Sequence, residues 1–298
     1  MLPEPPTSFL EASIREPARL RIAFSVTPPA GSPAVHAECR KAVLDAAALC
    51  ESLGHDVFEA TPQVTHEECC AVFRDVAAPM LAVAAGMVCG ATGRKVGPDT
   101  LEATTRALYE HGSRMTAVDF ALALGNVNAV SRKLGHFFTR CDLWLSPVLT
   151  SPPLPLGVLN ANEAGVDAAG WVRKLMDFAA FCPMFNGSGQ PAMSVPLHVT
   201  ADGLPVGVQF AARLGEEATL LALADSRLPT GGRWSLPPAR LRTDLPGTGE
   251  FVAEIGVGIV HHSQPAPARP IDPSVVLLQA ELKRRFDPAA RLNPGVIA

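Results

Sequence analysis

Apolar residues alternate between short compact runs and helical spacings in the first part of the chain. The run at residues 20–25 predicts a strand, and residues 34–53 keep small apolar and cysteine side chains on one helical face before Gly54. A second strand is expected at residues 56–60. Strand, helix and strand in this order form a βαβ unit, which implies two parallel strands joined by a right-handed crossover.

Apolar residues at helical spacing predict three further helices, over residues 66–90, 98–111 and 116–140. The most apolar stretch, residues 76–88, is about a dozen residues long, which is too short to span a bilayer. We therefore expect this stretch to be a buried helix of a protein that is not in a membrane.

The pattern then returns to strands with intervening helices. The expected strands lie at residues 142–146, 194–200 and 205–211, and the expected helices at residues 168–181 and 216–224. Asp202-Gly203 between two apolar runs is a strong hairpin signal, because this pair supplies the positive φ angles of a tight turn. The fold class that follows is α/β.

The composition of the chain changes after Asp225. Proline, glycine and arginine crowd the next two dozen or so positions without periodicity, which is typical of a linker. A strand at residues 250–260 and a helix at residues 273–286 follow. The expected organisation is a lead-in at residues 1–18, a main domain at 19–225, a linker at 226–249 and a short β-α tail at 250–298.

Composition and charge exclude several classes of protein. Hydrophobic residues make up 48% of the chain and charged residues 18%, which indicates a folded globular protein. The net charge is −4 and no basic block is present, so we expect no nucleic-acid partner. The proline-rich start lacks the pattern of a signal peptide, which favours a cytoplasmic location.

The seven cysteines are scattered over apolar stretches without a C-x-x-C spacing, which is typical of core thiols in a reducing compartment. His261 and His262 are adjacent on an expected strand, so their side chains point to opposite faces and are unsuited to share one ion. The sequence therefore predicts no metal site.

Three groups of residues, in a fixed order, resemble the amidase-signature family of hydrolases. Residues 19–57 resemble the middle of these enzymes, and residues 141–149 resemble one of their buried strands. Asn186-Gly-Ser-Gly-Gln-Pro-Ala-Met-Ser-Val-Pro196, followed by residues 202–209, resembles their late hairpin. The resemblance spans residues 19–224 and matches the C-terminal half of the family's domain. It implies a partial amidase-signature fold, in which a mixed sheet is wrapped by helices.

The resemblance also implies a chemistry, which is amide hydrolysis by a serine nucleophile, a second serine on a cis peptide and a lysine base. In the family these residues lie upstream of the strand matched here by residues 20–25. The residues before that strand include Ser8 and Ser13 but no lysine. We therefore expect no catalytic residue in this sequence, and a fragment that is catalytically incompetent.

The substrate-side residues that the resemblance implies are Asn186, Gly189 and Gln190. Gly187-Ser188-Gly189 does not have the G-x-S-x-G spacing of a nucleophile elbow, so we interpret it as a structural turn. Lys133 and Lys174 lie beside arginines on expected helices, which favours solvent-facing charges over a buried base.

The tail resembles a different family. Residues 250–258 and 286–295 resemble the C-terminal end of FAD-linked oxidases of the vanillyl-alcohol-oxidase type, in which the residue matched by Asn293 lies near the flavin. Those enzymes bind FAD mainly through an N-terminal glycine-rich domain that is not evident here. We therefore expect no cofactor, with FAD implied only by the resemblance of the tail.

Three functions remain open at this point. The first is an amidase remnant without activity. The second is an amidase that acts on a small amide substrate only when a complementing half supplies the catalytic residues. The third is a non-catalytic interaction module that binds a partner chain, or a second copy, through an exposed sheet edge.

Overall fold

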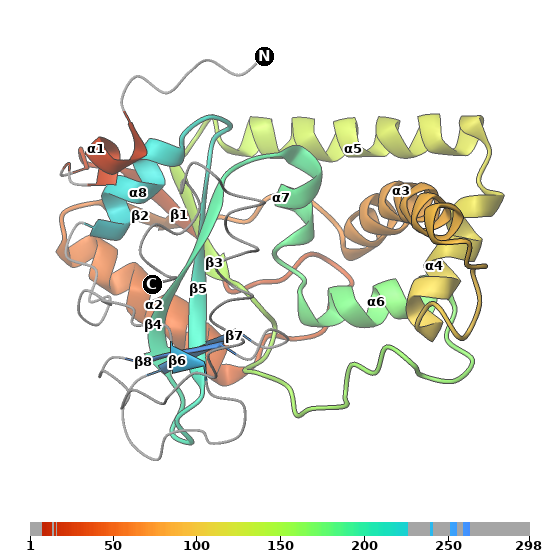
Figure 1. The fold of residues 1–298 in the computed structure, drawn as a ribbon. Helices are drawn as coiled ribbons and strands as arrows, with labels where there is room; N and C mark the ends of the chain where they lie inside the picture. The colour runs from red at the N-terminus through yellow and green to blue at the C-terminus, as the bar shows by residue number, and fades with distance from the viewer. Residues whose placement is uncertain are drawn as a thin grey trace. The chain divides into compact units, whose positions relative to one another are not determined.

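The computed structural model describes residues 8–13, 15, 17–225, 239–240, 251–254 and 259–262. The chain divides into two compact units, Met1–Thr230 and Gly231–Ala298, which are considered separately. The first unit is an α/β structure with a sheet and a group of helices that extends to one side of it (Figure 1).

The sheet of the first unit has five strands in the order β2-β1-β3-β5-β4. Their bounds are Arg21–Phe24 for β1, Asp56–Glu59 for β2, Leu143–Pro147 for β3, Ala192–Val199 for β4 and Pro205–Ala212 for β5. β1 runs parallel to both β2 and β3, whereas β5 is antiparallel to β3 and β4. The sheet is therefore mixed, which confirms the expected fold class.

The helix of the βαβ unit, α2 (Ala37–Ser52), packs against the sheet through one face. That face is formed by small side chains, among them Cys39, Val43 and Cys50, which are all buried. The parallel pairing of β1 and β2 around this helix confirms the βαβ prediction.

The centre of the core lies around Trp144 of β3, whose side chain is 1% exposed. Its ring centroid lies 6.1 Å from that of Phe137, 6.2 Å from that of Phe181 and 5.8 Å from that of Phe185. The indole N–H donates to the carbonyl of Ala60, so the polar end of the side chain is also satisfied.

Five of the seven remaining helices described in the first unit overlap helices expected from the sequence, whereas the two short ones, at residues 9–13 and 183–188, were not expected. The seven helices are α1 (Phe9–Ser13), α3 (His66–Thr92), α4 (Ala103–Arg114), α5 (Ala117–Phe137), α6 (Ala168–Phe178), α7 (Pro183–Ser188) and α8 (Glu217–Asp225). The helix expected at residues 168–181 ends at Phe178, and the short α7 then begins at Pro183, a residue suited to the first turn of a helix. We call α3, α4 and α5 the helical arm; α3 and α4 lie to the side of the sheet (Figure 1).

The expectation that residues 76–88 form a buried helix is wrong. These residues belong to α3, which is 27 residues long. Met80 and Val83 are each 64% exposed, Met87 is 70% exposed and Val88 is 63% exposed. By length and composition α3 could cross a bilayer, but one such helix is weak evidence for a membrane span. Apolar composition alone misled the prediction, since it does not reveal what covers a helix.

The described residues of the second unit form a three-stranded antiparallel sheet in the order β6-β8-β7. β6 is Ala239–Arg240, β7 is Phe251–Glu254 and β8 is Ile259–His262. Two strands thus stand where a single one was expected at residues 250–260. The helix expected at residues 273–286 lies outside the described residues.

Candidate functional site

The end of α7 and the connection to β4 contain the three residues that the family resemblance implies for the substrate side. Asn186 belongs to the last turn of α7, and Gly189 and Gln190 follow it. Gly189 ends α7 with φ +74°, and its N–H donates to the carbonyl of Phe185 at 2.9 Å. This left-handed conformation favours glycine and reverses the chain toward β4. Asn186, Gly189 and Gln190 are therefore within one turn of each other.

Gln190 is already engaged within the protein. Its side-chain N–H donates to the carbonyl of Ala212 at the end of β5 (3.3 Å), and its side-chain oxygen accepts from the Ser188 hydroxyl (3.0 Å). The amide thus fixes the turn to the sheet. Asn186, by contrast, is exposed, and its side chain makes no hydrogen bond within the described residues.

The turn also packs closely against the arm. A Cβ added to Gly187 would lie 2.8 Å from Cγ1 of Val72 on α3, so only glycine fits there without a shift. Ser188 has its hydroxyl turned toward Gln190 rather than toward a base. Gly187 and Ser188 are the last two residues of α7 and Gly189 ends it, so the segment interpreted as a structural turn is instead the C-terminal end of a helix.

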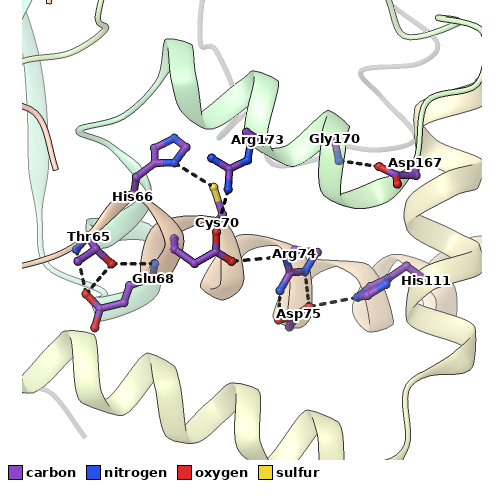
Figure 2. A network of polar contacts seen from close by, with 11 residues as sticks. Thr65, His66, Glu68, Cys70, Arg74, Asp75, His111, Asp167, Gly170 and Arg173 are labelled. Carbon is purple, nitrogen blue, oxygen red and sulfur yellow. Dashed lines mark hydrogen bonds and ion pairs between the residues drawn. The ribbon is translucent and has the colours of Figure 1, made fainter. Parts of the chain in front are cut away.

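A buried polar group that sequence reasoning missed lies at the start of α3 (Figure 2). Nδ1 of His66 is 3.7 Å from the Cys70 thiol, and its Nε2 is 3.0 Å from Oδ1 of Asp177 on α6. The latter contact has the distance of an ion pair but not the angle of a hydrogen bond. The spacing of His66 and Cys70, four residues apart on a helix, was the signal available in the sequence.

A thiol, an imidazole and a carboxylate in a row resemble the nucleophile, base and orienting group of a catalytic triad. The surroundings do not support that chemistry. Cys70 is 3% exposed, and burial raises the pKa of its thiol, so the reactive thiolate is disfavoured. The group instead links the first turns of α3 to α6.

Further along α3, charged side chains form a second network (Figure 2). Arg74 donates two hydrogen bonds to Asp75, at 2.7 and 2.8 Å, and Nε2 of His111 on α4 lies 3.1 Å from the same carboxylate. Burial alone would raise the pKa of Asp75, but the hydrogen bonds from Arg74 and His111 outweigh it and lower the pKa. The network therefore ties α3 to α4 through a fixed negative charge.

No lysine in the described part of the chain is buried. Lys133 pairs with Glu68 and Lys174 with Glu163, as expected of partly exposed charges. Between residues 17 and 225 no peptide bond is cis. The described residues thus contain neither a desolvated lysine base nor a serine on a cis peptide, the two features that the family chemistry requires.

All seven cysteines are free, and six of them are buried, which confirms the prediction of core thiols. Burial raises the pKa of the Cys69 thiol to about 12 and that of Cys50 to about 11, so both remain protonated. Asn293, which the tail resemblance implies for a flavin site, lies outside the described residues.

Two surface hollows lie on the helical arm rather than at the turn. One, of about 450 Å³, is lined by Arg94, Lys95 and Tyr109 among others, between α3 and α4. The other, of about 380 Å³, is lined by Asp75 and Leu122 among others. Neither includes Asn186, Gly189 or Gln190.

The mixed sheet, its helices and the glycine-rich turn before β4 define an α/β protein of the amidase type. The family model named Amidase matches residues 1–221. The chain belongs to the amidase family.

Individual relatives agree with this assignment. The 6-aminohexanoate-cyclic-dimer hydrolase of Paenarthrobacter ureafaciens is 28% identical over 225 residues, which are 72% of this chain and 45% of that protein. The putative amidase AmiB2 of Mycobacterium tuberculosis is 31% identical over 75% of this chain and 46% of its own length. A solved structure of 6-aminohexanoate cyclic dimer hydrolase matches with a TM-score of 0.67 at 25% identity, over 76% of this chain and 48% of that one.

The chain therefore spans about half the length of these relatives. More than half of each of them lies outside the matched part.

Proposed function

We propose that residues 19–225 form the substrate-side, C-terminal half of an amide hydrolase domain, and that the catalytic serines and the lysine come from the other half of such a domain. By itself this region does not hydrolyse amides. The observation that carries the proposal is the family match over about half the length of the relatives, together with the absence of a buried lysine from the described residues.

The chemistry explains why the second half is needed. A serine hydroxyl attacks an amide carbonyl only when a base removes its proton, and a lysine serves as that base only when burial lowers its pKa toward neutrality. The exposed and paired lysines described above are unsuited to this role. In the proposed domain, the free side-chain amide of Asn186 and the backbone at Gly189 contact the substrate, while Gln190 holds their turn in place.

The test is an assay of simple aryl and alkyl amides with the whole purified chain, alone and after co-expression with the unmatched part of the Paenarthrobacter hydrolase. The expected result is no turnover by the chain alone and measurable turnover by the pair. Turnover by the chain alone that survives Ser188→Ala would overturn the proposal. The purified protein is expected to be colourless, and bound flavin would overturn the expectation that Asn293 holds no FAD.

A further inference from the structure

The larger hollow of the arm, between α3 and α4, has a distinctive chemical lining. Its volume of about 450 Å³ is within the range of sites for small organic molecules. Three cationic side chains line it, those of Arg94, Lys95 and Arg106, together with a single carboxylate, that of Glu110. The net charge of the whole chain is −4, so this local excess of positive charge is not a general property of the protein.

Two glycines of α3 leave the space that the hollow occupies. Gly86 and Gly90 are four residues apart, so they lie on the same side of the helix. A Cβ added to either glycine would point into open space. Tyr109 lines the hollow from α4. The hollow therefore combines exposed backbone on one helix with an aromatic ring on the other.

The two adjacent cations are carried by backbone that is already fixed. Gly93 ends α3 in a left-handed conformation, and the Arg94 N–H donates to the Cys89 carbonyl at 2.9 Å. The Thr100 hydroxyl donates to the Lys95 carbonyl at 2.8 Å. Because this backbone is ordered before any ligand arrives, less conformational entropy is lost when one binds.

The cations of the hollow have few negative partners. The side chains of Arg94 and Lys95 form no ion pair or hydrogen bond with any described residue. Arg106 lies 3.9 Å from Glu110, and the same carboxylate also accepts a hydrogen bond from Arg114 at 3.3 Å. The dipole of α3 favours cations just after its C-terminal end, but it does not explain a third cation on α4.

We propose that this hollow binds a small organic phosphate, whose phosphate group contacts Arg94, Lys95 and Arg106 and whose organic part lies against the ring of Tyr109. The charges match, because three cations and one carboxylate leave two positive charges, and a phosphate monoester carries about −1.5 to −2 at neutral pH. Guanidinium groups bind phosphate oxygens in a bidentate manner, and an aromatic ring offers apolar contact area. The proposal does not depend on amide hydrolysis.

Tyr109 provides a local probe of the hollow, because it is the only tyrosine of the chain. The experiment labels the whole chain with 3-fluorotyrosine and follows its single fluorine resonance while phenyl phosphate is added at low salt. Calorimetry measures the affinity in parallel. The expected result is saturable binding that shifts the resonance and weakens as sodium chloride is added, since salt screens exposed charges.

The first variant removes two of the three cations. Arg94→Gln/Lys95→Gln should weaken the binding of phenyl phosphate about tenfold or more. The matched control Arg40→Gln/Lys41→Gln removes the same charge from an exposed adjacent pair on α2, and it should bind as tightly as the unchanged chain.

The second variant fills the hollow without changing its charge. Gly90→Leu places a side chain in the open space and should abolish both the binding and the shift of the resonance. Gly125→Leu, at an open glycine of α5 outside the hollow, is its control and should leave both unchanged. This pair of variants keeps the test valid if the loss of two cations disturbs folding.

Several results would overturn the proposal. No binding of phenyl phosphate would remove the site, and heat of binding without a shift of the fluorine resonance would place the ligand elsewhere. Unchanged affinity in Arg94→Gln/Lys95→Gln or in Gly90→Leu would exclude this hollow.

Related probes test the class of ligand. Benzoate that binds as tightly as phenyl phosphate would make a carboxylate sufficient, and phenol that does so would make the charge irrelevant. Inorganic phosphate of equal affinity would show that the organic part makes no contact with Tyr109. Weaker binding of all three is the expected result.

Discussion

Helices α2 and α3 are both long and rich in alanine and cysteine, yet their surroundings differ. α2 buries one face against the sheet and exposes Arg40, Lys41 and Asp45 on the other, so its charges mark the side that faces water. α3 has charges only in its first turns, and its second half exposes apolar side chains instead. The comparison shows that the second half of α3 lacks the charged, solvent-facing side that α2 has.

Local signals explain why α3 forms a helix even without a cover. Thr65 and Glu68 form a reciprocal capping box at its start, and Gly93 ends it in a left-handed conformation with φ +66°. Capping of this kind stabilises a helix independently of what packs on its sides. Helix formation and burial are thus separate properties in the arm.

The largest expected effect is the difference in stability loss when a buried valine of α2 and an exposed valine of α3 are each replaced by aspartate. Val43→Asp in α2 places a charge at a site that is 0% exposed and should cost more than about 4 kcal/mol, enough to unfold most of the protein. Val83→Asp in α3 should change the free energy of unfolding by about 0.5 kcal/mol or less. Urea denaturation measures both, and equal losses would contradict the exposure of α3 in the free chain.

A second test concerns the covered side of α3. Gly112→Ala should push α4 away from the Ala78 carbonyl and cost about 2–3 kcal/mol. Gly86→Ala, at an open position inside α3, should instead stabilise the protein by about 0.5–1 kcal/mol, because alanine loses less backbone entropy in a helix. Thermal melts distinguish the two, and a neutral Gly112→Ala would show that α4 does not pack closely on α3.

A third test measures how the stability of the protein depends on pH through Asp142, next to the sheet. Asp142 pairs with Arg21 at 2.9 Å and with Arg213 at 3.2 Å. Burial alone would raise the pKa of Asp142, but hydrogen bonds from Arg21 and the nearby arginine charges lower it. Since the pKa is lowered by folding, the carboxylate stabilises the protein above its unfolded pKa of about 3.9, and this contribution is lost as the pH falls through the folded value.

Asp142→Asn should therefore cost about 1–2 kcal/mol at neutral pH, and the variant should lose less stability than wild type below about pH 4. The matched control is Asp45→Asn, which breaks an exposed pair with Lys41 and should have almost no effect. Denaturation curves between pH 2 and 7 provide the measurement. Parallel losses for wild type and Asp142→Asn on acidification would contradict the ion pair.

The smallest expected effects concern Asn186 at the end of α7 and Gln190 just after it, which are expected to differ in their contributions to stability and to turnover. Gln190→Ala removes the contacts to Ala212 and Ser188 and should cost about 1 kcal/mol. Asn186→Ala, at an exposed side chain, should leave stability within about 0.5 kcal/mol but reduce amide turnover by the complemented pair. If the complemented pair turns over amides equally well with Asn186→Ala and with the unchanged chain, Asn186 does not contact the substrate.

The order and type of elements in the first unit could be predicted from the sequence because periodicity is a local property. The βαβ unit and the hairpin at Asp202-Gly203 needed only apolar spacing and turn residues, and Gly203 has φ +82° in the structure. The exposure of Met80 could not be predicted, since periodicity identifies an apolar side but not its neighbour.

The candidate site was predictable to a similar extent. The position of the turn at residues 186–190 followed from a motif, whereas the engagement of Gln190 depends on Ala212, a residue brought close only by the sheet. The contact of His66 with Asp177 likewise joins two helices that are distant in sequence. Such contacts between remote segments leave no local pattern.

The position of the arm within the chain affects how the protein folds. Arg21 and Asp142, whose contact flanks the pairing of β1 with β3, are 121 positions apart, and the whole arm lies between them. Contacts of such separation form late, because the loop between them must close first. During synthesis the exposed apolar residues of α3, Met80, Val83, Met87 and Val88, are therefore made before the centre of the sheet can form. We expect this interval to be when the nascent chain most needs a chaperone.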